Sequence, residues 1–422
     1  MHSSSCITRL LSLALLALSP WAATPARAES AAVDARSATL RQAYDTAWAR
    51  QPEALSVDLR RDAAEARSRQ AEAWTVEPPS IEMGAKSDRV LKNDGDREYE
   101  AGLILPLWLP GERGRSGAVA EAEAKVVDSR VAAARLRTAA AVRDAWWTWQ
   151  RLLGERNLTQ SRLVSARRLA EDVGRRVRAG DLALADRHQA EGAAAAAEVA
   201  LAESDSQLAR AAQQLRAVTG LLPAPAASER PENLPPLPSD FTALDATHPA
   251  AVELFDRAEL ARRVADLASV QTRNNPELLL ATTRQRGAFG EPWQQTVTLG
   301  VRIPFGSENR NRARVGQARA EAIETETQLR LERDRLAADL EAARIQVESA
   351  RLQLAAAEKR AGLARESRGF FEKSFRLGET DLPTRLRIEI EAVEAERQAS
   401  RARIDLAAAI SSLRQALGLL PE

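Results

Sequence analysis

The chain has 422 residues, of which only 4% are aromatic, and Ala, Arg, Glu and Leu dominate its composition. This composition is typical of long helices rather than of a compact α/β domain. Lys and Arg number 60 against 59 for Asp and Glu, so the net charge of +1 creates no global field to attract nucleic acid. A nucleic-acid partner is therefore not expected.

The first 28 residues have the features of a secretory signal peptide. Arg9 supplies a positive charge, residues 10–18 form a short apolar core, and Ala26 and Ala28 are small residues suited to cleavage. Cys6 lies in this segment and is the only cysteine, so the mature chain has no disulfide and no cysteine metal site. After residue 28 no 18 consecutive residues are apolar, so any membrane crossing has to use β-strands.

The rest of the chain consists of two copies of one unit at an offset of 198 residues. A constant offset between landmarks is the mark of an internal repeat. The aligned landmarks are Pro78 with Pro276, Gly102 with Gly300, Pro106 with Pro304, Gly180 with Gly378, and 220–223 with 418–421. We expect a first repeat over 29–220, a proline-rich connector over 221–246 and a second repeat over 247–422.

Each repeat is expected to run helix, hairpin, very long helix and shorter helix. The first repeat opens with a helix over about 37–74, which stops before a pair of prolines. Residues that alternate between apolar and polar or small predict the four strands. These strands cover about 80–87, 98–105, 278–285 and 296–303. Each hairpin thus has one apolar face and one polar or small face.

Two very long helices are expected at about 112–178 and 310–376, where the apolar period changes from 2 to about 3.5. At 1.5 Å per residue each is roughly 100 Å long, which suits a coiled-coil conduit or scaffold better than a globular domain. Gly180 and Gly378 suit the left-handed ends of these helices. Asp181 and Thr380 are then placed to cap the helices that follow.

A shared membrane barrel is the simplest use of the two hairpins. Strands of about 8 to 10 residues suit a tilted bilayer crossing, but four strands cannot close a barrel and open edges are costly in lipid. Three chains would supply twelve strands. Trp108 and Phe305, just past a strand in each repeat, are expected at the bilayer interface. Arg302, on the polar face of its strand, is expected to point into the barrel lumen.

With these features the chain resembles the TolC family of trimeric outer-membrane factors, the exit ducts of tripartite efflux pumps and type I secretion systems. The resemblance covers essentially the whole mature chain. Segment 107–115, LWLPGERGR, is similar to that of the CzcC-like branch, which serves heavy-metal efflux. The resemblance implies a mainly α fold with a transmembrane β part, in which a trimeric 12-stranded β-barrel continues into an α-helical periplasmic tunnel.

The resemblance also implies location and partners. The protein is expected as a homotrimer in the outer membrane of a Gram-negative bacterium, surrounded by lipid and with a long periplasmic extension. Its tunnel would meet a periplasmic adaptor, the membrane fusion protein, and an inner-membrane pump of the RND type. Heavy-metal cations are the cargo that segment 107–115 favours, with drugs and proteins as the other cargo classes.

In this family the two helical turns form the tunnel tip that contacts the adaptor. By position, the implied tip residues are Ala179, Gly180, Asp181 and Leu182, with Leu377, Gly378, Glu379 and Thr380. Asp186 matches an acidic position that the family uses in closing contacts. The second repeat departs from this pattern, with Thr384 and Arg387 at the corresponding acidic positions. Two alternatives to the family's acidic gate stay open: Glu379 and Asp381 replace the acidic positions, or the gate is of mixed charge. The candidate gate residues are Asp186, Asp381 and Arg387.

No catalytic, cofactor or metal site is expected. Beyond the signal peptide only His188 and His248 remain, with no catalytic spacing of acids around either, and segment 111–117 lacks the lysine of a phosphate-binding loop. Two other functions stay open. One is a periplasmic coiled-coil adaptor or scaffold, which would share the long helices, and the other is an exit duct for type I protein secretion.

Overall fold

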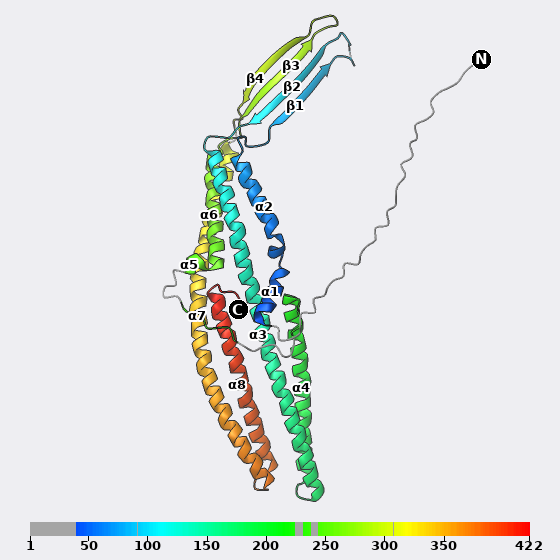
Figure 1. Cartoon of the computed structure of the whole chain (residues 1–422), viewed down its shortest axis with the longest axis vertical. Coiled ribbons are helices and arrows are strands. Elements are labelled where there is room, and N and C mark those ends of the chain that lie inside the picture. Colours follow the sequence, from blue (N-terminus) through cyan, green and yellow to red (C-terminus); the bar gives the residue numbers. More distant parts are fainter. Residues whose placement is uncertain (1–38, 91, 224–230, 238–243, 307) are drawn as a thin grey trace, which may run out of the picture. The chain divides into compact units, whose positions relative to one another are not determined.

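The computed structural model describes residues 39–90, 92–223, 231–237, 244–306 and 308–422. The expected signal peptide over 1–28 and parts of the connector over 221–246 lie outside these residues. The described chain repeats the order helix, hairpin, very long helix, helix (Figure 1). The expected mainly helical fold with a small antiparallel sheet is confirmed.

The two repeats contain equivalent elements. The first contains α1 (Leu40–Ala49), α2 (Pro52–Glu72), β1 (Ser80–Ser87), β2 (Arg97–Pro106), α3 (Glu112–Ala179) and α4 (Leu184–Thr219). The second contains α5 (Leu244–Thr247), α6 (Pro249–Val270), β3 (Glu277–Arg286), β4 (Gln294–Arg302), α7 (Glu308–Arg376) and α8 (Leu382–Ala416). Except for α1 and α5, equivalent elements begin and end within about two residues of the 198-residue offset.

The helix expected over 37–74 is divided into α1 and α2, which is a correction to the sequence-based expectation. Pro52 takes the first position of α2, where the missing N–H costs nothing, whereas inside a helix the ring would clash with the preceding turn. At the other end of α1, Thr39 and Gln42 form a reciprocal capping box. Both ends of α1 are therefore fixed by local sequence.

The four strands form one antiparallel sheet in the order β1-β2-β3-β4. The hairpins join through β2 and β3, where Leu103 lies opposite Leu280. The register gathers apolar side chains on one face, namely Ile81, Met83, Leu103, Leu280, Val297, Leu299 and Val301. The other face carries acidic, hydroxyl and small residues, among them Glu82, Glu100, Gly102, Ala281, Thr296, Thr298 and Gly300. The alternation expected from the sequence thus appears in the paired strands.

The turn from β2 into α3 is organised by Glu112, the first residue of α3, whose side chain is buried. Its carboxylate accepts hydrogen bonds from Leu109 N at 2.9 Å, Gln271 Nε2 at 2.7 Å and Asn275 Nδ2 at 2.5 Å. Because Gln271 and Asn275 lie between α6 and β3, this one carboxylate joins the strand-to-helix junction of the first repeat to the helix-to-strand junction of the second. The acidic residue of LWLPGERGR therefore has a structural role.

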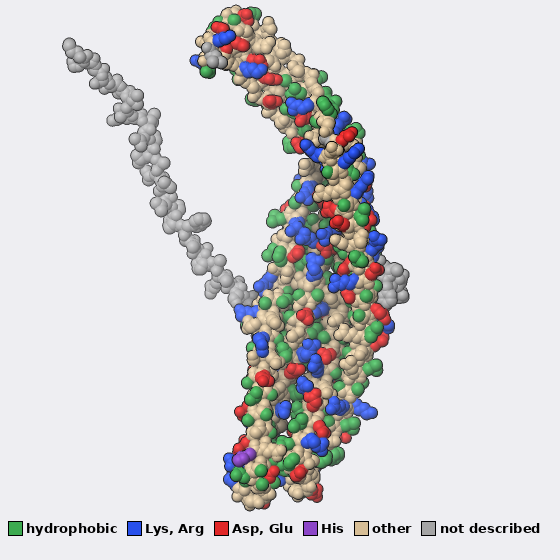
Figure 2. Space-filling model, turned by 180° about the vertical axis from the view of Figure 1, so that it is seen from behind, with side chains coloured by type: hydrophobic (Ala, Val, Ile, Leu, Met, Phe, Trp, Pro, Cys, Tyr) green, Lys and Arg blue, Asp and Glu red, His purple; other side chains and the backbone are tan. Residues whose placement is uncertain are grey.

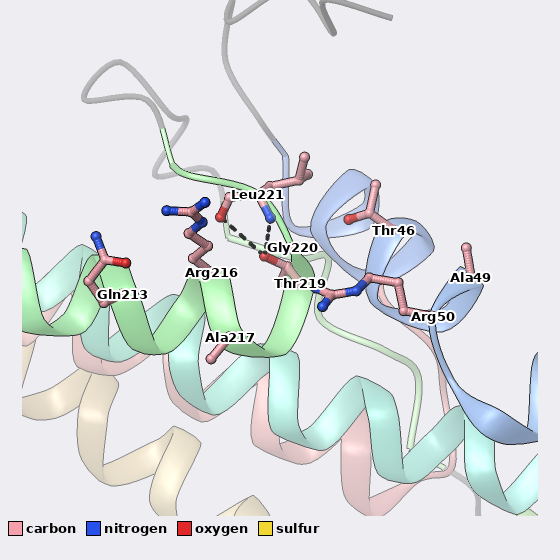
Figure 3. A pocket seen from close by; sticks show the side chains of 9 residues that line it. All are labelled: Thr46, Ala49, Arg50, Gln213, Arg216, Ala217, Thr219, Gly220 and Leu221. Atoms are coloured by element: carbon pink, nitrogen blue, oxygen red, sulfur yellow. Dashed lines mark hydrogen bonds between the residues drawn. The ribbon is translucent and has the colours of Figure 1, made fainter. Parts of the chain in front are cut away.

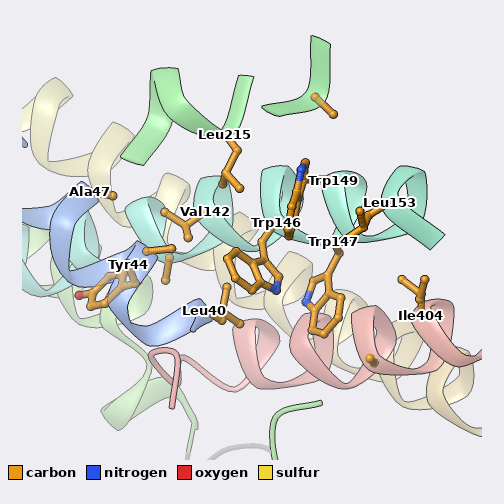
Figure 4. Close-up of a cluster of buried hydrophobic side chains, with 14 residues drawn as sticks. Leu40, Tyr44, Ala47, Val142, Trp146, Trp147, Trp149, Leu153, Leu215 and Ile404 are labelled. Carbon is orange, nitrogen blue, oxygen red and sulfur yellow. The ribbon is translucent and has the colours of Figure 1, made fainter. Parts of the chain in front are cut away.

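The largest buried apolar cluster lies where α1, α3, α4 and α8 meet (Figure 4). Trp146, Trp147 and Trp149 of α3 are all buried there, with Tyr44 of α1 and Leu215 of α4 beside them. These three tryptophans therefore pack between helices. Figure 2 shows acidic and basic side chains interspersed along the outer surfaces of the helices. In the described ranges, no helix combines the length and the apolar character needed to cross a membrane.

Residues 231–237 of the connector are attached to the helices by a buried ion cluster. Glu232 accepts hydrogen bonds from Arg143 of α3, with Nη2 to Oε1 at 2.9 Å and Nε to Oε2 at 3.1 Å. Arg414 of α8 lies 3.2 Å from the same carboxylate, and the Ser411 hydroxyl donates to it. Trp147 Nε1 in turn donates to Ser411 Oγ at 2.8 Å. One carboxylate thus links the connector, α3 and α8.

Because His248 is buried at the start of α6, we expect the stability of the folded chain to depend on pH. Its Nδ1 accepts a hydrogen bond from Ala250 N at 3.3 Å, and burial lowers its pKa against a smaller opposing effect of the Gln415 carbonyl. The unfolded chain therefore binds a proton more readily. The contribution of His248 to the free energy of unfolding is complete above the unfolded pKa of about 6.5. It is lost as pH falls through the window below that value.

We expect the free energy of unfolding to decrease between about pH 7.5 and 5.5, by at most about 1.4 kcal/mol per pH unit from this group. The variant His248→Asn retains an N-cap acceptor without titrating in this range, so its slope should be smaller. Denaturant titrations of both proteins at each pH give the comparison. Equal slopes would show that His248 does not cause the dependence.

Candidate functional site

The predicted tip residues lie in the turns between α3 and α4 and between α7 and α8, at the end of the helices remote from the sheet (Figure 1). Gly180 and Gly378 have left-handed φ values of 88° and 80°. In both turns the residue after the glycine donates its N–H back to the long helix, Asp181 to Arg176 O at 2.9 Å and Glu379 to Ser374 O at 3.0 Å. The two turns therefore share one backbone conformation.

The two turns differ in what they expose. A Cβ added at Gly180 or Gly378 would meet nothing within 4 Å, so only the backbone conformation restricts substitution there. Leu377 is 76% exposed, whereas Leu182 packs against a buried cluster of the hairpin. The second turn thus presents a free apolar side chain.

The three predicted gate residues are each engaged within their own helix. Asp186 accepts a hydrogen bond from Ala183 N at 3.0 Å, and Asp381 accepts one from Thr384 N at 3.1 Å. Hydrogen bonds from Thr384 also hold the pKa of Asp381 below its usual range. Arg387 pairs with Glu391 at 2.8 Å. Asp186 and Asp381, rather than the expected Asp181 and Thr380, therefore cap the returning helices.

The contact that joins the two helical hairpins near their tips is made by Phe375 of α7. Its buried ring packs in a cluster with Leu169 and Val173 of α3. The guanidinium groups of Arg176 and Arg385 each lie 4.8 Å from the ring centroid. Arg176 Nη1 also donates to Phe375 O at 3.0 Å. We call this set of five residues the hairpin clasp.

A cavity of about 930 Å³ lies beside the clasp, between the two hairpins. Its lining carries both signs of charge: Arg368 approaches Glu389 at 3.7 Å and also pairs with Glu396 at 3.3 Å. Burial raises the pKa of Glu389 and lowers the pKa of Arg385. The charges next to the clasp are therefore mixed and not acidic alone.

A second cavity, of about 640 Å³, opens between α1 and the end of α4 (Figure 3). Gly220 has a φ of 81°, and a Cβ there would come within 2.5 Å of Arg50 Nη1. Thr219 Oγ1 donates to Leu215 O at 2.8 Å and accepts from Leu221 N at 3.1 Å. This cavity therefore surrounds the C-terminal end of α4, where Thr219 forms its hydrogen bonds with neighbouring residues of the same helix end. Among the described residues no group of three or more His, Cys, Asp or Glu is placed to hold a metal ion.

The predicted membrane and lumen residues lie where the sheet meets the helices. Arg302, at the end of β4 on the polar face, pairs with Glu277 across the strands at 3.0 Å. Trp108 is half-buried and donates from Nε1 to Ala73 O at 3.0 Å, while Phe305 is 95% exposed. At this end of the sheet the Trp108 ring is therefore held by a hydrogen bond, whereas the Phe305 ring is exposed.

The apolar face of the sheet is open to its surroundings. Ile81, Met83, Val297 and Leu299 are between 70% and 79% exposed, although they are large aliphatic side chains. A contiguous patch of this kind is unusual on a protein surface that contacts only water and marks a contact with lipid or with another protein.

Comparison with known proteins accounts for this combination of a sheet, long helices and glycine turns. Residues 43–221 match the family model described as outer membrane efflux protein. The matched segment corresponds to most of the first repeat and is less than half of the chain. The description of this family agrees with the outer-membrane location that the sequence predicts. No curated protein matches the chain.

Solved structures share the fold of this chain over nearly its whole length. VceC, an outer membrane protein of Vibrio cholerae, is 18% identical with a TM-score of 0.71, covering 91% of this chain and 97% of VceC. The CmeC outer membrane channel of Campylobacter jejuni is 13% identical with a TM-score of 0.72, covering 90% and 85%. CusC is 16% identical with a TM-score of 0.73, covering 90% and 92%. At these identities the likeness concerns the fold.

Proposed function

We propose that this chain is the outer-membrane exit channel of a tripartite efflux system and works as a homotrimer. The sheet is the observation that carries the proposal. One face exposes large apolar side chains, the other carries polar and small ones, and within the described chain β1 and β4 are each paired on one side only. Because unpaired edges are costly in lipid, joining β4 of one copy to β1 of the next in a ring of three would close a barrel.

The decisive test is the mass of the protein extracted from the outer-membrane fraction in mild detergent. We expect a trimer that dissociates into single chains on boiling. A monomer or dimer recovered in the soluble periplasmic fraction would overturn the proposal. The long helices would then belong to a periplasmic adaptor or scaffold.

We further propose that the two glycine turns dock on a periplasmic adaptor that connects the channel to an inner-membrane pump of the RND type. The turns share one backbone conformation, and the exposed Leu377 offers an apolar contact between them and a partner. The hairpin clasp next to the turns would hold the tunnel closed until the partner binds. Docking and opening would then occur at the same end of the helices.

Substitution of the tip glycines separates recognition from helix capping. Asparagine tolerates a left-handed φ, whereas valine is strained there by roughly 1–2 kcal/mol or more. If the adaptor contacts the bare glycine backbone, Gly378→Asn and Gly378→Val should both lower export, by about tenfold or more, with an unchanged yield of trimer.

The same pair of variants at Gly180 gives an independent comparison, since its surroundings are equally open. Export is followed as cargo efflux from loaded cells, and trimer yield is measured on unboiled gels. Normal export by the asparagine variants, with valine variants that lose export and trimer together, would assign the glycines to capping alone.

For the cargo we propose heavy-metal cations, because segment 107–115 is similar to the CzcC-like branch. Cells that lack the gene should become sensitive to divalent transition-metal ions, and the restored gene should raise the tolerated concentration severalfold. Rescue of drug tolerance or of protein secretion without rescue of metal tolerance would replace this cargo with a drug or with a type I secretion substrate.

A further inference from the structure

Two arginines and three aromatic rings gather at the end of the sheet that is remote from the helices. The guanidinium groups of Arg284 and Arg286 lie 5.1 Å and 4.9 Å from the ring centroid of Trp293. Arg286 also lies 5.4 Å from the Phe289 ring, and Tyr99 stacks on Trp293 at 5.8 Å. Stacking on aromatic faces fixes the guanidinium groups before any ligand binds.

These arginines belong to the apolar face of the sheet. Side chains alternate along a strand, so Arg284 and Arg286 share a face with Leu278, Leu280 and Thr282 of β3. The path from Leu278 to Arg286 is roughly 27 Å along the strand, or about 20 Å along the normal of a membrane at the usual strand tilt. The change from apolar to cationic side chains therefore falls near the rim of a typical apolar band.

Among the described residues, no carboxylate neutralises the charges of Arg284 and Arg286. Nearby Arg97 pairs with Asp88 at 2.6 Å, and Lys86 on the opposite face pairs with Glu98 at 2.8 Å. In the described part of the chain neither Arg284 nor Arg286 has a carboxylate partner, and only one N–H donor of Arg286 is taken up, by Gly95 O at 3.2 Å. Two adjacent guanidinium groups with free N–H donors suit the oxygens of a phosphate group.

We propose that Arg284, Arg286 and Trp293 bind a phosphate group of lipid A, the phosphorylated glycolipid of the outer leaflet. This inference rests on the proposed function, which places this end of the sheet at the outer surface. The apolar face beneath the arginines would contact the acyl chains of the same lipid. Trp293 would contact the region between the acyl chains and the headgroup. A free phosphate ion would use the charge but not the apolar wall, so the lipid headgroup is the better match.

Native mass spectrometry of the trimer titrated with bisphosphorylated lipid A tests the site. We expect the double variant R284Q/R286Q to bind lipid A about tenfold or more weakly than the wild type. The control is K86Q, which removes a cation from the same end of the sheet but from the opposite face, and it should bind like the wild type. The variant R284K/R286K keeps the charge without the paired N–H donors and should be intermediate.

The outcomes separate the two proposals. An intact outer-membrane trimer that binds lipid A equally well with and without the arginines overturns the lipid site alone. Loss of lipid A in the presence of about 10 mM inorganic phosphate would assign the arginines to a free anion instead. A chain that forms no membrane trimer, measured before lipid is added, overturns the proposed function and the lipid site together. If R284Q/R286Q lowers the trimer yield, lipid A binding is instead compared between the wild type and R284K/R286K.

Discussion

Replacement of Glu232 by alanine should lower the free energy of unfolding by about 3–5 kcal/mol. The carboxylate is almost fully buried between Arg143 and Arg414, whose side chains are only 4% and 7% exposed. Removal of the one anion that both arginines share would leave the buried Arg143 without its carboxylate partner and Arg414 with only Glu422, whose side chain is 47% exposed, and this costs more than the loss of a favourable contact. The connector would also lose its attachment to α3 and α8.

Tryptophan fluorescence in a denaturant titration measures this effect, because Trp147 donates to the same Ser411 hydroxyl that donates to Glu232. The matched control is Glu198→Ala, which removes a carboxylate from an exposed pair with Arg167, with side chains 51% and 58% exposed. That change should cost less than about 1 kcal/mol. Equal losses in the two variants would show that the ion cluster contributes no more than a surface pair.

Replacement of Phe375 by alanine should open the channel. The substitution removes a buried aromatic ring from the hairpin clasp, a change that typically costs about 3–5 kcal/mol. It also leaves Arg176 and Arg385 without the ring on which both stack. If the clasp holds the closed state, a loss of about 3 kcal/mol shifts the balance between closed and open states by more than a hundredfold.

Conductance of purified trimers in planar bilayers measures this shift, and we expect a severalfold increase for Phe375→Ala. Phe370→Ala is the matched control, since Phe370 lies on the same helix and is exposed. It removes the same side chain without changing the clasp. Unchanged conductance in Phe375→Ala, with a normal trimer yield, would exclude the clasp as the gate.

The hairpins were predictable because their determinants are local. Alternation along each strand fixes which side chains share a face, and the left-handed glycines at 180 and 378 end both long helices. The division of α1 from α2 was also encoded locally, by Pro52, yet the continuous helical pattern around it concealed the break. For Asp186 and Asp381 the sequence suggested a gate, whereas in the structure both side chains cap the helices that follow the turns.

The clasp and the buried ion cluster could not be predicted in the same way. Phe375 accepts its hydrogen bond from a residue 199 positions away, and Glu232 binds an arginine 89 positions away. Neither partner is indicated by spacing or periodicity, because only the packing of the helices brings the pairs together. The one sequence signal was compositional: three of the seven phenylalanines fall within 370–375, just before the second turn.

In the described chain β1 and β4 are each paired on one side only, and these open edges have a genetic consequence. In the proposed trimer every barrel seam is made by two different chains, so a chain with a defective edge strand spoils each assembly that it enters. When wild-type and defective chains are made in equal amounts and mix freely, only about one trimer in eight contains three intact chains. Mutations in these two strands should therefore be dominant over a wild-type copy of the gene, whereas changes that merely unfold the chain before assembly should be recessive.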